Sequence, residues 1–163
     1  MYYPERKLNR LKNYDYSWPG YYFVNICAKN GQGTLGNVQG ERIILNKYGE
    51  IVKKQWVWLE KQYSYIKHDA WIIMPDHLHG IIIIKGVGNG RDRSLRKIKP
   101  LWEIIGAFKT TSSRLIHKSG LPQFQWQKSF YDHIIRNDHD LNRIREYIRN
   151  NPLKWKLEQE PQK

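Results

Sequence analysis

Cysteine and long apolar runs are scarce in this sequence of 163 residues. Because Cys27 is the one cysteine, no intramolecular disulfide can form, and a thiol in a reducing compartment is expected. No apolar stretch reaches the roughly 20 residues that span a bilayer, and the N-terminal stretch MYYPERKLNRLKNYDYSW lacks the apolar core of a signal peptide. These absences predict a cytoplasmic protein that does not enter a membrane.

Acidic residues are also few. The chain has 15 Asp and Glu residues against 28 Lys and Arg residues, which leaves a formal net charge of +13. A positive field of this size on a small body favours a polyanionic partner, although a basic, well-solvated surface has the same composition. Charge alone does not choose between DNA, RNA and a membrane surface.

The hydrophobic pattern changes period along the chain, which separates strands from helices. Apolar and β-branched runs bounded by turn residues predict strands, and apolar residues at spacings of three and four predict helices. We expect strands over 21–29 and 41–46, with GQGTLG as a turn between them, and then a helix with Val52, Trp56, Leu59, Tyr63 and Ile66 on its inner face. Next come strands over 69–74 and 77–85, a helix from Leu101 that ends near Ser119, an extended stretch over 124–136, and a last helix that is capped by Asn137 or Asp138 and stopped by Pro152.

This order predicts an α+β fold in which helices pack on one antiparallel sheet, close to the ferredoxin-like or RRM-like split βαβ plan. The length suits one domain over residues 1–163. We expect an irregular N-terminal arm over 1–19, a basic flexible connector over 85–99 and a solvated C-terminal tail over 156–163.

Two histidines open the second strand of the central pair, in the stretch MPDHLHGIIII. Because side chains alternate across a strand, His77 and His79 point to the same face with their Cβ atoms about 7 Å apart. That arrangement suits two ligands of one metal ion, and it equally suits two imidazoles that only bond to nearby backbone carbonyls. A metal site needs a further ligand from elsewhere in the chain.

The last helix carries a second polar pair in REYIRNNP. Tyr147 and Asn151 are four residues apart and therefore share a helix face, which differs from the apolar face of Ile148. A phenol and a carboxamide on this face can reach a site on the sheet. A tyrosine that only buries its ring and an asparagine that only ends a helix are the structural alternatives.

The stretches MPDHLHGIIII, SFYDHIIR and REYIRNNPLKW, in this order, resemble the single-tyrosine transposases of the His-hydrophobic-His superfamily. The resemblance is strongest to the REP-associated tyrosine transposases, and it runs from about Tyr21 to Trp155. It also includes FVNICAKN, ILNKYGEI and the Phe108-Lys109 helix.

The resemblance implies a function and a site. Tyr147 matches the catalytic nucleophile, and His77, His79 and Asn151 match the metal ligands, with Mg²⁺ or Mn²⁺ as the implied ion. The implied reaction cleaves and rejoins single-stranded DNA at hairpins of REP-like palindromic repeats through a 5′-phosphotyrosine. Asp76 stands where the family usually has asparagine. The resemblance leaves both a homodimer and a monomer open.

DNA must also be held by basic and aromatic side chains. Lys and Arg contacts to phosphate position a strand, and aromatic rings such as Trp18 or Trp126 can stack on unpaired bases. Besides His133 on the strand beside the site, the candidate DNA-binding residues are Arg91, Arg93, Arg96, Lys97, Lys99, Lys109, Arg114, Arg136, Arg143 and Arg149.

Two other functions fit the same residues. A catalytically inactive single-stranded nucleic-acid-binding domain explains the charge and the aromatic residues, and it predicts no covalent adduct. A metal-dependent DNA hydrolase, in which Tyr147 only orients water, predicts cleaved DNA free of protein. A replication initiator or relaxase is disfavoured, because the chain has neither a second domain nor a paired catalytic tyrosine.

Overall fold

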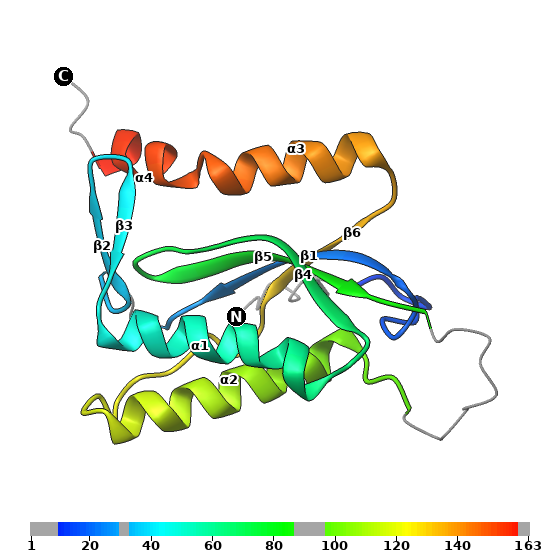
Figure 1. Ribbon diagram of the computed structural model, residues 1–163, viewed down its shortest axis with the longest axis horizontal. Helices are drawn as coiled ribbons and strands as arrows, with labels where there is room; N and C mark the ends of the chain where they lie inside the picture. Colours follow the sequence, from blue (N-terminus) through cyan, green and yellow to red (C-terminus); the bar gives the residue numbers. More distant parts are fainter. Residues whose placement is uncertain (1–9, 30–32, 87–96, 160–163) are drawn as a thin grey trace, which may run out of the picture.

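The structure is a computed structural model that describes residues 10–29, 33–86 and 97–159 (Figure 1). Its elements in chain order are β1 (Gly20–Cys27), β2 (Gly36–Gln39), β3 (Arg42–Leu45), α1 (Lys47–Gln62), β4 (Ile66–Ile73), β5 (His77–Ile84), α2 (Leu101–Lys118), β6 (Tyr131–Ile135), α3 (Asp138–Arg149) and α4 (Asn151–Gln159). None of the helices in the described ranges is long and apolar enough to cross a membrane.

The central sheet has the strand order β4-β5-β1-β6, and each neighbouring pair is antiparallel. Without the separate β2–β3 hairpin, the chain runs β1-α1-β4-β5-α2-β6, which with this strand order is the split βαβ arrangement. Helices α1 and α2 cover one face of the sheet, and α3 crosses the other face (Figure 1). The expected α+β fold with a ferredoxin-like plan is confirmed.

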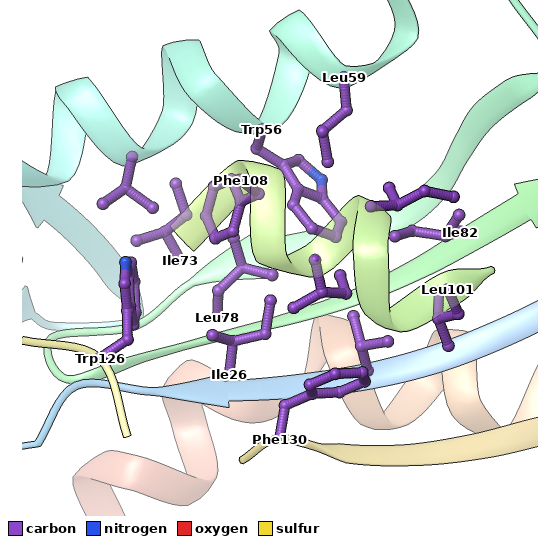
Figure 2. Packing of buried hydrophobic residues seen from close by; sticks show 14 of the residues in the cluster. Ile26, Trp56, Leu59, Ile73, Leu78, Ile82, Leu101, Phe108, Trp126 and Phe130 are labelled. Carbon is purple, nitrogen blue, oxygen red and sulfur yellow. The ribbon is translucent and has the colours of Figure 1, made fainter. Parts of the chain in front are cut away.

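The main core lies between the sheet and helices α1 and α2. Fully buried side chains from both helices, among them Trp56 and Phe108, meet side chains of the two central strands, such as Ile26, Leu78 and Ile82 (Figure 2). A smaller core lies on the opposite face, where Phe23, Ile81 and Ile135 of the sheet meet Leu141, Ile144 and Ile148 of α3. Alternation along β5 therefore sends Leu78 to one core and Ile81 to the other.

The helix boundaries follow local capping. Asn46 caps α1 by accepting hydrogen bonds from the backbone N–H groups of Tyr48 and Gly49, and Asn137 caps α3 through the N–H of Asp140. Of the two caps expected for α3, Asn137 and Asp138, the structure has Asn137, and the expected end of α2 near Ser119 is confirmed.

One strand was missed, and two expectations about local structure were wrong. Residues 36–39 form strand β2, which pairs antiparallel with β3 and starts at the last residue of the predicted turn. Gly36 permits this pairing, because a Cβ there would lie 2.3 Å from the carbonyl oxygen of Ile44. Helix α1 ends at Gln62, since the backbone at Tyr63 is already extended, and Ile66 opens β4. Pro152 does not stop the final helix but lies in the first turn of α4, where a proline leaves no helical hydrogen bond unmade.

The termini and the connector lie only partly within the described residues. Residues 10–19 form no helix or strand, yet they pack on the main core. Tyr16 is 2% exposed, and the hydroxyl of Tyr22 donates to the Trp18 carbonyl at 2.7 Å. Within the predicted C-terminal tail, residues 156–159 belong to α4. Residues 1–9, 87–96 and 160–163 of the predicted arm, connector and tail lie outside the described residues.

Candidate active site on the open half of the sheet

His77 and His79 lie at the start of β5 on the sheet face that α3 crosses. Their Nε2 atoms are 2.9 Å apart, and their ring centroids are 4.4 Å apart with the ring planes 76° to one another. Two nitrogens that bind one ion at adjacent corners of an octahedron, each about 2.1 Å from the ion, lie about 3 Å apart. The geometry therefore suits either a hydrogen bond between the two rings or a shared cation.

Asp76 orients the first of these rings. Its Oδ1 lies 2.5 Å from Nδ1 of His77, on the side of the imidazole away from His79. A carboxylate on Nδ1 keeps the proton there and leaves the Nε2 lone pair free, which is the usual support of a metal-binding histidine. Asp76 therefore contacts the histidine pair through His77.

His79 is held as a neutral imidazole. It is 4% exposed, its ring stacks on Phe23 at 5.6 Å, and burial, with smaller contributions from His77 and Lys154, lowers its pKa to about 3. Its Nδ1 is buried and makes no hydrogen bond to any residue in the described ranges. A neutral ring at ordinary pH is the form that binds a metal.

Tyr147 reaches this pair from α3. Its ring lies 5.4 Å from the His79 ring and 6.2 Å from the Phe23 ring, and the residue is 41% exposed. The apolar residues Ile144 and Ile148 anchor the helix on the sheet. The helix surface that carries Tyr147 therefore lies beside the histidines and remains open to solvent.

A bidentate ion pair holds the same helix on its other side. The Nε of Arg145 donates to Oδ1 of Asp69 at 2.7 Å, and a terminal nitrogen donates to Oδ2 at 2.6 Å. Asp69 lies at the irregularity of β4 between His68 and Trp71. This contact joins α3 to the edge strand at a point two residues from Tyr147.

The sequence predicted that Asn151 lies on the same helix as Tyr147, and this was wrong. The helix of Tyr147 ends at Arg149, and after a break at Asn150 a new helix, α4, begins at Asn151. Asn151 is 5% exposed, which makes it one of the few buried polar residues in the described ranges. It lies four residues from both Tyr147 and Trp155, and the Trp155 ring lies 6.0 Å from the His77 ring. Asn151 is therefore one helical turn from Trp155, which flanks His77, whereas the break at Asn150 separates it from the helix of Tyr147.

The donor set is limited. Nowhere in residues 10–29, 33–86 and 97–159 do three or more His, Cys, Asp or Glu side chains come together in a way that could hold a metal ion. A cation bound by His77 and His79 would thus take its remaining ligands from an amide oxygen, from substrate or from water.

Three neighbours of the site were missed from the sequence. Phe23 forms its floor, Trp155 flanks His77, and the Nζ of Lys154 lies 5.4 Å from the centroid of the Tyr147 ring. The sequence does carry a signal for Lys154 and Trp155, because they lie within one helical turn of Asn151. Phe23 carried no such signal, since it reads as an ordinary strand residue.

The predicted DNA-binding residues are spread over the molecule, and Arg91, Arg93 and Arg96 lie outside the described residues. Lys97 and Lys99 are exposed just before α2, where the Nζ of Lys99 pairs with Glu103 at 2.9 Å. Arg114 is exposed on α2, the helix that packs on the face of the sheet opposite Tyr147.

Two predicted DNA-binding residues, Lys109 and His133, already have protein partners. Lys109 donates to the carbonyls of Gln127 and Ser129, and burial lowers its pKa to about 8. The Nε2 of His133 lies 2.6 Å from a carboxylate oxygen of Asp140. These contacts give both side chains a structural role.

The remaining predicted DNA-binding residues lie on α3 or next to it. Arg136 and Arg149 are exposed near its two ends, and Arg143 is exposed but paired with Asp140. Of the two tryptophans expected to stack on bases, Trp18 is 53% exposed, whereas Trp126 is 8% exposed and packs in the main core, where its Nε1 donates to Ser112. Trp126 is therefore a core residue.

No protein-family model matches the chain. An uncharacterised protein of Haemophilus influenzae is 32% identical over 165 residues, which cover 94% of this chain and 92% of that protein. A REP-associated tyrosine transposase of Escherichia coli is 26% identical over 115 residues, or 67% of this chain and 61% of that protein. A solved structure of a REP-associated tyrosine transposase bound to a REP hairpin superposes with a TM-score of 0.63 at 21% identity, over 90% of this chain and 73% of that one.

Proposed function

We propose that this chain, which is similar in sequence and in fold to REP-associated tyrosine transposases, cleaves and rejoins single-stranded DNA at hairpin sites of palindromic repeats through a covalent bond to Tyr147. One observation carries the proposal. An exposed tyrosine lies 5.4 Å, ring to ring, from a buried neutral histidine whose Nε2 converges with that of a second histidine. The related protein solved with a REP hairpin supports hairpin DNA as the substrate.

The side chains present fit a divalent cation. His77 and His79 would hold it through their Nε2 atoms, which are separated by 2.9 Å, and the buried carboxamide of Asn151 would complete the site. Two nitrogens and an amide oxygen suit Mn²⁺, and cellular abundance favours Mg²⁺. When bound, such an ion supplies charge neutralisation at the phosphate oxygens.

Tyr147 performs the covalent step. Its phenolic oxygen attacks the phosphorus of a phosphodiester, the bond from phosphorus to the 3′ oxygen breaks, and the phenolic proton is balanced by the proton that the released 3′-hydroxyl takes up. The product is a 5′-phosphotyrosine with a free 3′-hydroxyl. Because the phosphotyrosine keeps the ester bond, attack by a 3′-hydroxyl reverses the step and rejoins DNA without ATP.

The positive field brings the substrate to this site. A net charge of +13 attracts a polyanion, and Lys154 places one cation beside the nucleophile and the histidine pair. Arg136 and Arg149, which are exposed near the two ends of α3, add positive charge there. Phosphate contacts from these residues would hold a strand near Tyr147 without reading its sequence.

A denaturing gel tests the proposal. The protein is mixed with labelled single-stranded DNA that carries a repeat hairpin, with Mg²⁺ or Mn²⁺ or with chelator. We expect a slowly migrating protein–DNA adduct that needs the cation and that is absent from Tyr147→Phe and His77→Ala. Tyr63→Phe and His139→Ala are the matched controls, because they make the same substitutions away from the site, and both should form the adduct.

Two outcomes would replace this function. Cleaved DNA without adduct would mean that water is the nucleophile and that the chain is a hydrolase. Tight binding of several hairpins with no cleavage would mean that it is a binding domain.

A further inference from the structure

A row of three side chains crosses the sheet from the histidine pair to its open edge. His79 of β5 is the register partner of Asn25 of β1, and Asn25 is in turn the register partner of Tyr131 of β6. All three point to the face that α3 crosses, because Phe23, two residues from Asn25 on β1, packs in the core beneath α3. Opposed residues on neighbouring strands have Cβ atoms about 5 Å apart, so Tyr131 lies roughly 10 Å from His79.

Tyr131 is open to solvent although its neighbours are not. It is 52% exposed, whereas Phe23 beside it is 7% exposed and His79 is 4% exposed. The Phe23 ring lies 6.2 Å from Tyr131 and 6.2 Å from Tyr147, so it separates two exposed tyrosines. Helix α3 therefore covers the middle of this face and leaves an aromatic ring uncovered on each side of Phe23.

Asn25 lies between this exposed ring and the histidine pair. Its Oδ1 accepts one weak contact from the Cys27 thiol at 3.5 Å, and its amide nitrogen donates to no residue in the described ranges. A partly buried amide with free donors beside an exposed aromatic ring is a combination that suits a nucleobase, which offers a flat face for stacking and polar atoms along its edge.

We propose that Tyr131 and Asn25 form a binding subsite for one unpaired base of the DNA strand, next to the phosphate that Tyr147 attacks. This inference rests on the proposed function. Tyr131 stacks on the face of the base, and Asn25 bonds to its edge. The net charge of +13 favours DNA as the occupant of this surface over an apolar partner.

The Tyr131 ring, as the stacking platform of this subsite, should contribute to the binding of every DNA sequence. Stacking on an aromatic side chain tolerates every base, since each base has a π face. Removing the ring should therefore weaken the binding of all sequences, while removing only the hydroxyl should change little. Tyr131→Ala and Tyr131→Phe separate these two contributions, and because the side chain is exposed, neither should affect folding.

The test uses DNA that contains 2-aminopurine, whose fluorescence falls when it stacks. The base analogue is placed in turn at each position beside the hairpin foot, and the protein carries Tyr147→Phe so that the DNA stays intact. We expect quenching at one position, retained with Tyr131→Phe and lost with Tyr131→Ala. Affinity by fluorescence anisotropy should fall about 5- to 150-fold for Tyr131→Ala, as for the loss of one stacked base.

Trp102→Ala is the matched control, because it removes a 41% exposed ring from α2 on the other side of the sheet and should leave quenching and affinity unchanged. Unchanged quenching and affinity in Tyr131→Ala, or an equal loss in Tyr131→Phe, would overturn the stacking platform. The gel with Tyr147 intact keeps this failure distinct from failure of the proposed function: if wild-type protein forms the adduct, only the platform is lost.

Discussion

Gly80 follows His79 on β5 and faces Trp56 of the main core. Replacing this glycine with alanine should destabilise the protein. A Cβ at this position would lie 2.5 Å from Cζ2 of Trp56, 3.2 Å from Cη2 and 3.3 Å from Cε2. The Trp56 ring cannot easily withdraw, because it stacks on His68 at 4.5 Å, meets the edge of Phe108 at 5.4 Å and is fully buried. Either the ring or strand β5 must therefore move.

The magnitude follows from two opposing effects. Overpacking of a well-packed core costs about 1–3 kcal/mol, and alanine gains about 0.5–1 kcal/mol over glycine in the backbone entropy of a strand. Because the contact of 2.5 Å is severe, we expect a net loss of about 2 kcal/mol in the free energy of unfolding, which lowers Tm by roughly 4–8 °C for a chain of this size. Since Gly80 follows His79, a displaced β5 should also slow adduct formation.

Calorimetry and urea unfolding measure this loss. Gly106→Ala is the matched control, because a Cβ at this exposed helical position meets nothing within 4 Å, and the variant should gain about 0.5–1 kcal/mol. Trp56→Phe in the Gly80→Ala background should recover stability relative to the sum of the two single changes. A neutral or stabilising Gly80→Ala, with Gly106→Ala behaving as expected, would refute the tight fit of Trp56 against β5.

Three further predictions concern other contacts. Asp69→Ala removes the bidentate partner of Arg145 and should cost about 1–2 kcal/mol in urea unfolding; a double-mutant cycle with Arg145→Ala that shows no coupling would contradict the ion pair. Burial lowers the pKa of His68, so as the pH falls below about 6.5 the unfolded chain binds a proton before the folded chain does, and stability is lost. His68→Gln should flatten this loss between pH 7 and pH 5, and an unchanged slope would exclude His68 as its source. Lys154→Gln removes the cation beside the Tyr147 ring and should slow adduct formation roughly tenfold in single-turnover assays, with Lys154→Arg close to wild type; equal rates would exclude an electrostatic role.

The sequence by itself determined what depends on local backbone geometry. Strand alternation placed His77 and His79 on one face, and the spacing of apolar residues gave α2 and α3 with their inner faces. Capping chemistry limited the start of α3 to Asn137 or Asp138, and the structure shows that Asn137 is the cap, since its side-chain oxygen accepts from the backbone N–H of Asp140. These features need no knowledge of the rest of the chain.

Tertiary structure alone decided which distant segments meet. The Arg145–Asp69 pair joins residues 76 apart and sets α3 over the sheet, and the break at Asn150 redirects α4 so that Lys154 and Trp155 reach the tyrosine and the histidines. Phe23 became the floor of the site only because β1 pairs between β5 and β6. The spacing of apolar residues is a local pattern and can be read from the sequence. These contacts depend on packing between distant segments, and the local sequence of one segment does not indicate which other segment it meets.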